Sequence, residues 1–118
     1  MLGMYGDTKE TMDRTIRLSL SEPFDIVNFA ISAPYPGTEW GDIASQNGWL
    51  VDPRWEAYDQ NYSAQVSQPD CDIALVKRMQ RNAYFRWYFS HRGIKFLANG
   101  FKPEYFSYFY NTIRDHLR

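Results

Sequence analysis

The sequence predicts an α/β chain with one or two short parallel strands, about four helices and a helix-dominated C-terminal half. Residues 3–11 place two glycines before a capped helix, and residues 26–31 form an apolar, β-rich run that ends in a proline-rich turn. Later residues carry apolar side chains at helical spacing. The order turn, helix, strand, loop is one repeat of a parallel α/β architecture. We divide the chain into residues 1–50, which hold this repeat, and residues 51–118, a helical extension.

Length and composition describe one domain with a single core. The chain has 118 residues, of which 18% are aromatic, while mean hydropathy is negative at −0.56. A single cysteine, Cys71, excludes an internal disulfide and any cysteine-only metal or cluster site within one chain. Because no apolar run approaches the roughly 20 residues that span a bilayer, we expect a soluble, cytoplasmic protein with no membrane partner.

Charge is divided unevenly along the chain. The net charge is −1, but residues 1–72 carry twelve acidic and four basic side chains, whereas residues 73–103 carry seven basic side chains and no acidic one. Such asymmetry favours two segments that dock on each other or face different partners.

The first elements are a strand end and a helix. Residues 1–5 are too few for a complete strand, so we expect the sequence to start inside a fold. Asp7 or Thr8 caps the helix, Asp7 and Glu10 fit a capping box, and Pro23 ends it. The stripe expected to face the core consists of Met12, Ile16 and Leu20.

Residues 24–33 are predicted to form a buried strand. The side chains at Ile26, Val27, Phe29 and Ile31 are apolar on both faces, which is typical of an interior parallel strand covered by helices. The prolines of residues 33–37 end it. Because an open sheet edge here needs a cover, we expect self-association, a homo-oligomer in isolation.

The remaining elements are less regular. Thr38 is expected to cap a short helix that ends near residues 47–48, and residues 49–51 form a short strand or a packed loop. Residues 52–69 are interpreted as a surface excursion in which Trp55 and Tyr58 are anchors.

Two helices are predicted after that excursion. Asp70 or Asp72 caps the longest, residues 73–92, and the last spans about residues 103–117. Arg92 and Gly93 suit the C-terminal end of the first. Its core stripe is predicted to be Ile73, Val76, Met79, Ala83 and Trp87, with Phe89 as a further candidate.

Three features that can carry chemistry in other proteins are better explained here as ordinary structure. The spacing of Gly3 and Gly6 before a helix permits phosphate binding, but an ordinary turn is favoured because Asp7 places a carboxylate at the helix end that an anion needs. His91 and His116 lack a partner at metal-binding spacing. Cys71 lies between two aspartates that oppose thiolate formation, so it is a poor nucleophile.

The basic segment leaves two interpretations open. Lysines and arginines of residues 77–95 alternate with aromatic side chains, as in surfaces that bind single-stranded nucleic acid or an acidic partner. The interpretation we favour is an amphipathic helix whose cationic face is solvated or pairs with the acidic first half, since the sequence pI is about 6.1.

Residues 3–11 (GMYGDTKET) and 29–38 (FAISAPYPGT), taken in order, resemble the C-terminal half of the radical S-adenosylmethionine (SAM) barrel. The most similar branch is the cobalamin-binding one that includes the anaerobic magnesium-protoporphyrin monomethyl ester oxidative cyclase. The resemblance covers most of the chain and implies that residues 1–50 end such a barrel. It implies SAM adenine neighbours at Gly3, Asp7, Phe29 and Ile31. Tyr5 departs from the family pattern, which has proline there.

The same resemblance implies a chain that is catalytically incomplete alone. Members hold SAM, a four-iron, four-sulfur cluster and, in this branch, cobalamin; the three-cysteine loop that binds the cluster is not in this sequence. We therefore expect no catalytic residue, metal ligand or complete cofactor site here. The expected role is to finish the barrel and wall the SAM and substrate cavity, with the remainder of the barrel, a separately encoded partner or a second copy as its partner.

Overall fold

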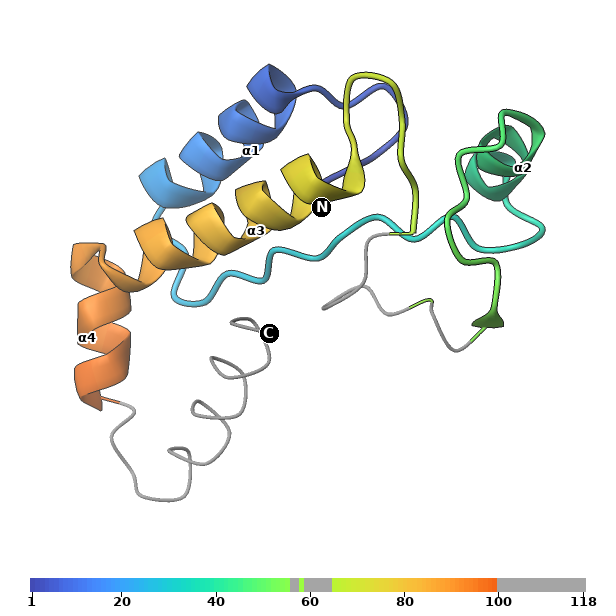
Figure 1. Cartoon of the computed structure of the whole chain (residues 1–118). Coiled ribbons are helices and arrows are strands. Elements are labelled where there is room, and N and C mark those ends of the chain that lie inside the picture. Colours follow the sequence, from blue (N-terminus) through green and yellow to red (C-terminus); the bar gives the residue numbers. More distant parts are fainter. Residues whose placement is uncertain (56–57, 59–64, 100–118) are drawn as a thin grey trace.

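The computed structural model describes residues 1–55, 58 and 65–99, and within them it holds four helices: α1 (Lys9–Ser21), α2 (Glu39–Gln46), α3 (Ile73–Tyr88) and α4 (His91–Asn99). Helices α1 and α3 run side by side in the same direction, α4 turns away from the end of α3, and α2 lies apart from this pair (Figure 1). The last predicted helix, 103–117, lies outside the described residues.

Helix α1 is capped by Thr8, one of the two predicted caps, and not by Asp7. The amide of Thr11 donates to Thr8 Oγ1 at 3.3 Å, and the amide of Thr8 donates to Thr11 Oγ1 at 2.9 Å, which is a reciprocal capping box. The predicted box of Asp7 and Glu10 is therefore wrong. The reason is that the Asp7 carboxylate accepts instead from the Met4 amide of the preceding turn and from the Thr11 hydroxyl. The predicted core stripe is confirmed, since Met12 and Ile16 are fully buried and Leu20 packs against the same core.

The predicted strand is reduced to one parallel bridge between Leu2 and Ile31. The Leu2 amide donates to the Ala30 carbonyl at 2.9 Å, and the Ser32 amide donates to the Leu2 carbonyl at 2.8 Å. Val27 is partly buried against the core and Phe29 is buried, as predicted. Ile26 is 68% exposed, so its predicted burial is wrong, because it lies ahead of the part of the segment that packs on the core.

Helix α3 lies along the other edge of this extended segment. Gln80 Nε2 donates to the Phe29 carbonyl at 2.8 Å, the Phe29 amide donates to Tyr84 Oη at 3.1 Å, and Tyr84 Oη bonds to Asn28 Oδ1 at 2.7 Å. Both backbone groups of Phe29 are thus satisfied by helix side chains, where a sheet would use a neighbouring strand. The cover that we expected from another chain is supplied here by α3. Self-association stays a prediction.

The predicted long helix, 73–92, is two helices. Helix α3 is capped by Asp72, whose Oδ1 accepts from the Leu75 amide at 2.7 Å. It ends at Tyr88, and α4 starts after Ser90, whose hydroxyl donates to the Trp87 carbonyl at 2.6 Å and accepts from the Gly93 amide at 3.2 Å. Gly93 therefore lies in the first turn of α4, and the prediction that it ends the helix is wrong.

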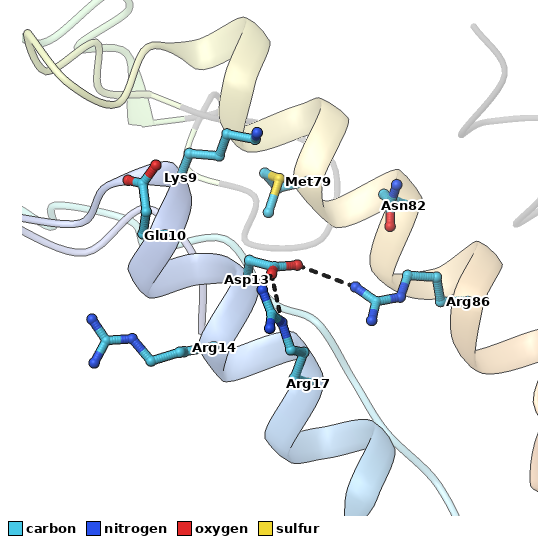
Figure 2. A pocket seen from close by; sticks show the side chains of 8 residues that line it. All are labelled: Lys9, Glu10, Asp13, Arg14, Arg17, Met79, Asn82 and Arg86. Carbon is cyan, nitrogen blue, oxygen red and sulfur yellow. Dashed lines mark hydrogen bonds and ion pairs between the residues drawn. The ribbon is translucent and has the colours of Figure 1, made fainter.

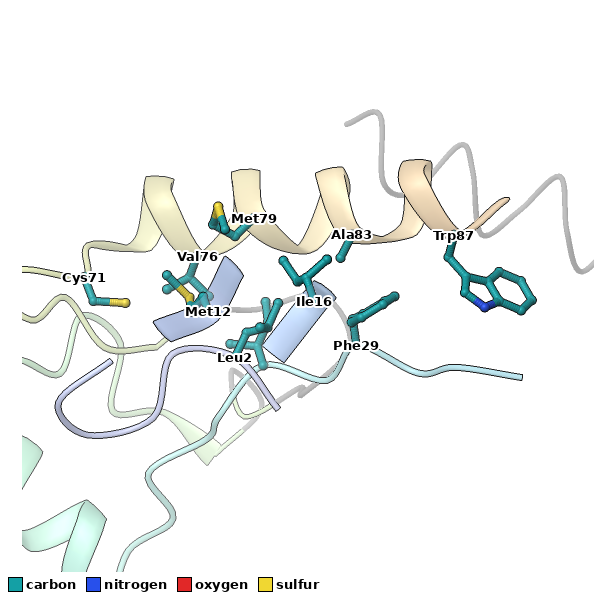
Figure 3. Packing of buried hydrophobic residues seen from close by; sticks show 10 residues of the cluster. Leu2, Met12, Ile16, Phe29, Cys71, Val76, Met79, Ala83 and Trp87 are labelled. Carbon is teal, nitrogen blue, oxygen red and sulfur yellow. The ribbon is translucent and has the colours of Figure 1, made fainter. Parts of the chain in front are cut away.

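A single apolar core joins the start of the chain, α1, the extended segment and α3 (Figure 3). Each fully buried large side chain in it contributes roughly 1.5–3 kcal/mol. The predicted α3 stripe is confirmed, except that Phe89 is exposed beyond the end of the helix. The buried members are Leu2, Met12, Ile16, Phe29, Ile31, Cys71, Val76, Met79, Ala83 and Trp87.

Helix α2 and its neighbours form a second, smaller unit of packing. The Gly41 amide donates to Thr38 Oγ1 at 3.1 Å, which confirms Thr38 as the cap, and Gly48 ends the helix with a φ of 67°. Leu50 then forms an antiparallel bridge with Val66. None of the four helices in the described part of the chain has the length and apolar character needed to cross a membrane.

Candidate functional site

The turn before α1 is held in one conformation by bonds from several directions. The Asp7 amide donates to the Met4 carbonyl at 3.0 Å, and Gly6 has a φ of 77°, as in a type II turn. The Asp7 carboxylate accepts from the Met4 amide at 2.9 Å and from Thr11 Oγ1 at 2.7 Å. From the far side, Gln68 accepts from the Gly6 amide at 3.0 Å and donates to the Met4 carbonyl at 2.9 Å.

A second turn follows the extended segment. The Thr38 amide donates to the Tyr35 carbonyl at 3.2 Å, and Gly37 has a φ of 82°. Helix α2 sits directly on this turn, because a Cβ added to Gly41 would lie 2.2 Å from the Tyr35 carbonyl oxygen. Only glycine allows so close an approach of helix and turn.

The two turns lie at the same edge. Leu2 and Ile31 pair in parallel, so the turns that follow them leave the pair at its carboxyl end, where ligands bind in parallel α/β proteins. Ring contacts confirm the proximity: the centroid of Tyr5, in the first turn, lies 5.5 Å from that of Trp40 on α2. Backbone Gly6 and Gly37 both face open space, with no atom within 4 Å of an added Cβ. We call the turns 3–7 and 33–38 the paired-turn edge.

Sequence reasoning missed the aromatic side chains of this edge. Tyr5 also approaches Trp49 at 6.2 Å, and Trp40 lies 6.4 Å from Trp49. Trp40 Nε1 donates to Ser32 Oγ at 3.1 Å, which fixes the indole relative to the extended segment. The signal that could have found this cluster was the aromatic residue at position 5, where the resembling family has proline.

The four predicted SAM neighbours do not share one environment. Gly3 follows Leu2, which forms the bridge with Ile31, and Gly3 has a φ of 75° with its backbone against Val76. Phe29 and Ile31 are 3% and 2% exposed, and both belong to the apolar core. Asp7 lies in the first turn, and its carboxylate accepts from the Met4 amide and from Thr11 Oγ1 of α1. The assignment of these residues to SAM stays a prediction.

A separate open groove of about 540 Å³ runs between α1 and α3 (Figure 2). Asp13 is its central acid: it is bound by Arg17 on the same helix and by Arg86 of α3, whose Nη1 lies 3.2 Å from Asp13 Oδ1. These arginines, Arg17 foremost, lower the pKa of Asp13. The groove is lined by Lys9, Glu10, Asp13, Arg14, Arg17, Met79, Asn82 and Arg86.

Two arginines of the basic segment, residues 77–95, are bonded within the chain. Arg86 pairs with the acidic first half of the chain, as the interpretation we favoured expects, and Arg92 donates to the last carbonyls of α1. Lys77, Arg78 and Arg81 are exposed on α3. Binding of nucleic acid or an acidic partner stays a prediction for this smaller set.

The described residues offer neither a reactive cysteine nor a group of metal ligands. Cys71 is 1% exposed, and burial, followed by the charges of Asp7 and Asp72, raises the pKa of its thiol to about 11. It is therefore a poor nucleophile, as the sequence indicated. Among residues 1–55, 58 and 65–99, no three His, Cys, Asp or Glu side chains group in a way that could hold a metal ion.

Comparison with known proteins gives one informative similarity. Over 88 residues, which are 75% of this chain, the sequence is 31% identical to an uncharacterized methyltransferase of Pyrococcus horikoshii. The aligned part is 19% of that protein, so the chain spans about a fifth of the curated relative it matches. No family model matches the sequence, and no solved structure matches it.

Proposed function

We propose that this chain is part of a SAM-dependent enzyme of the radical SAM class and that its paired-turn edge walls the SAM and substrate cavity. The observation that carries the proposal is the parallel pairing of Leu2 with Ile31, because it sets both family-like turns at one carboxyl edge. The ordered motifs of residues 3–11 and 29–38 support the class, and the name of the archaeal relative supports the use of SAM.

Two reaction types follow from the two resemblances. The motifs are most similar to those of the oxidative cyclase branch, whereas the relative carries the name of a methyltransferase. We propose methyl transfer as the first candidate, because the relative's alignment spans three quarters of the chain and not two motifs alone. Oxidative ring closure is the alternative, and cobalamin belongs to either proposal only through the family resemblance.

The residues present fit part of the cofactor set. Open space beside Gly6 and Gly37 lets a ligand approach the backbone at both turns, which suits an adenosyl group. An iron–sulfur cluster does not fit, because the chain has a single cysteine and a cluster is held by several cysteine thiolates. In this proposal the chain binds and orients SAM and the substrate, and another part of the enzyme carries the cluster.

A titration of the ¹⁵N-labelled chain with S-adenosylhomocysteine tests the proposal. We expect changes in amide chemical shift confined to residues 3–7 and 32–38. Replacing Gly6 with Asn keeps the left-handed backbone but fills the open space, so it should weaken these changes. Gly48→Asn is the matched control, since Gly48 has a similar φ of 67° and equally open surroundings and lies outside the turns 3–7 and 33–38. Shifts that are absent, or that Gly6→Asn leaves intact, would contradict the proposal.

A further inference from the structure

The groove between α1 and α3 carries an excess of positive charge. Four of its lining side chains are cationic and two are acidic, so four positive charges less two negative ones leave a local charge of +2. The chain as a whole has a net charge of −1, and the excess is therefore a property of this groove. The charged residues that line it are Lys9, Glu10, Asp13, Arg14, Arg17 and Arg86.

Two of these cations, one from each helix, are held in place by Asp13. Its Oδ2 accepts from Nε of Arg17 at 2.7 Å and from Nη2 of the same side chain, and its Oδ1 accepts from Nη1 of Arg86 at 3.2 Å. Figure 2 shows both guanidinium groups directed at this one carboxylate from opposite walls of the groove. Because the protein already orders both side chains, a ligand that binds them loses less free energy to ordering.

Most of the donors on the two guanidinium groups are not used by Asp13. A guanidinium has five N–H donors, of which Arg17 gives two and Arg86 gives one to Asp13, so three and four remain. In the part of the chain that the structure describes, neither guanidinium makes a further hydrogen bond. The two side chains are 70% and 39% exposed, so a ligand in the groove can reach these donors.

The two acids of the groove leave these donors accessible to an anion. Both carboxylate oxygens of Asp13 accept from the arginines, so its charge is already offset by theirs. Hydrogen bonds with its own backbone amide, followed by one with Thr8, lower the pKa of Glu10, which ties that carboxylate to the start of α1. In Figure 2 it lies away from Arg86, while Lys9 extends from α1 toward α3.

We propose that the groove between α1 and α3 binds the phosphate monoester group of a small molecule, with Arg17 and Arg86 donating to its oxygens and Lys9 adding charge. A phosphate monoester carries about −1.5 to −2 charge at neutral pH, which matches the local charge, and its oxygens fit the planar fork of arginine. The groove of about 540 Å³ is larger than a phosphate group alone. It lies within the range of roughly 300–1,000 Å³ that is usual for small-molecule sites.

This site is separate from the proposed SAM cavity. The groove is lined by none of residues 3–7 and 33–38, which form the paired-turn edge. Because S-adenosylhomocysteine contains no phosphate, its titration and a phosphate titration report on different parts of the chain. Failure of either proposal therefore leaves the other one standing.

Methyl phosphate and dimethyl phosphate are a matched pair of probes for this site. At about pH 7 the monoester is mostly a dianion, since its second pKa is about 6, whereas the diester carries one negative charge. Each is titrated into the ¹⁵N-labelled full chain at constant ionic strength, and the Nε–H signals of Arg17 and Arg86 are followed by NMR. We expect methyl phosphate to shift both signals and to bind at least about fivefold more tightly than dimethyl phosphate.

Substitutions distinguish the groove from the general positive charge of α3. Arg17→Gln and Arg86→Gln should each weaken methyl phosphate binding by about fivefold or more, because each removes charge-assisted donors. Arg81→Gln removes an exposed arginine of α3 that does not line the groove, so it is the control and should leave the affinity unchanged. Thermal unfolding of the three variants shows that the fold is kept.

Three results would overturn the proposal. Unshifted Nε–H signals of Arg17 and Arg86 would show that phosphate does not enter the groove. Equal affinity for the two probes in the wild-type chain, which needs no variant, would remove the preference for a monoester and would favour a phosphodiester chain such as nucleic acid. Equal weakening by Arg81→Gln and Arg86→Gln would show that binding depends only on the overall charge of α3.

Discussion

Gln80 Nε2 donates to the carbonyl of Phe29 at 2.8 Å across 51 residues of sequence, so a helix side chain occupies the place of a sheet hydrogen bond. Tyr84, one turn later, accepts from the amide of the same residue at 3.1 Å. The spacing of four residues puts both polar groups on one face of α3. A chain with one short parallel pair can thereby close one of its edges without a further strand.

Replacing Gln80 with Leu should destabilise the fold by about 1–3 kcal/mol, because the Phe29 carbonyl would remain buried without a donor. The measurement is the free energy of unfolding from urea titration. Gln46→Leu makes the same chemical change at an exposed position near the end of α2 and should cost much less. If the two variants lose the same free energy of unfolding, the hydrogen bond to Phe29 does not contribute measurably to stability.

Arg92 should stabilise the end of α1. Its guanidinium donates to the carbonyls of Leu20 at 3.1 Å, Ser21 at 3.3 Å and Glu22, groups that a helix end leaves without partners. Lysine cannot reproduce this fork of donors, so Arg92→Lys should speed hydrogen exchange in the last turn of α1 by about fivefold or more, equivalent to roughly 1 kcal/mol.

The control for this prediction is Lys95→Ala, which removes a cation from an exposed position of the same helix. It should leave exchange at residues 18–22 unchanged. If Arg92→Lys leaves this exchange as unchanged as Lys95→Ala does, the fork of donors adds nothing to the stability of the end of α1.

Helices with strong local signals were predictable from sequence, and their exact ends were less so. Thr38 and the stripe of Met12 and Ile16 were correct because cap chemistry and helical spacing are local. Of the two predicted caps of α1, Thr8 was correct and Asp7 was not, because the Asp7 carboxylate accepts from the Met4 amide and the Thr11 hydroxyl. The break near Ser90 was not predicted, because a serine hydroxyl can both end one helix and begin the next.

The candidate site was predictable only as backbone. The glycines of residues 3–6 and the turn of residues 33–38 pointed to an edge, since glycine and proline act through local dihedral angles. The ring contacts of Tyr5 and the clamp by Gln68 join residues more than 30 positions apart, and no local pattern encodes such pairs.

Gly41→Ala should displace α2 from its turn. An added Cβ would lie 2.2 Å from the Tyr35 carbonyl oxygen, a backbone atom that cannot move without the turn. We expect loss of the contact between Tyr5 and Trp40, seen as a shift of the Trp40 indole signal, and a lower thermal midpoint. Ser45→Ala, exposed on the same helix, is the control and should change neither. An unchanged indole signal in Gly41→Ala would show that α2 does not depend on this approach.

Cys71 should make stability fall at alkaline pH. Its folded pKa is raised to about 11 by burial, above an unfolded value near 9.0, so the folded state retains a proton that the unfolded state loses. The contribution is fully present below pH 9 and is lost as the pH rises through about 11. Urea unfolding of wild type and Cys71→Ala between pH 8 and that range measures it, and the variant should show the smaller decline.

Burial of the Cys71 thiol also predicts slow alkylation by iodoacetamide in the native state and fast alkylation in urea. Rapid alkylation of the native protein would place the thiol at the surface, and it would contradict both this prediction and the predicted loss of stability at alkaline pH.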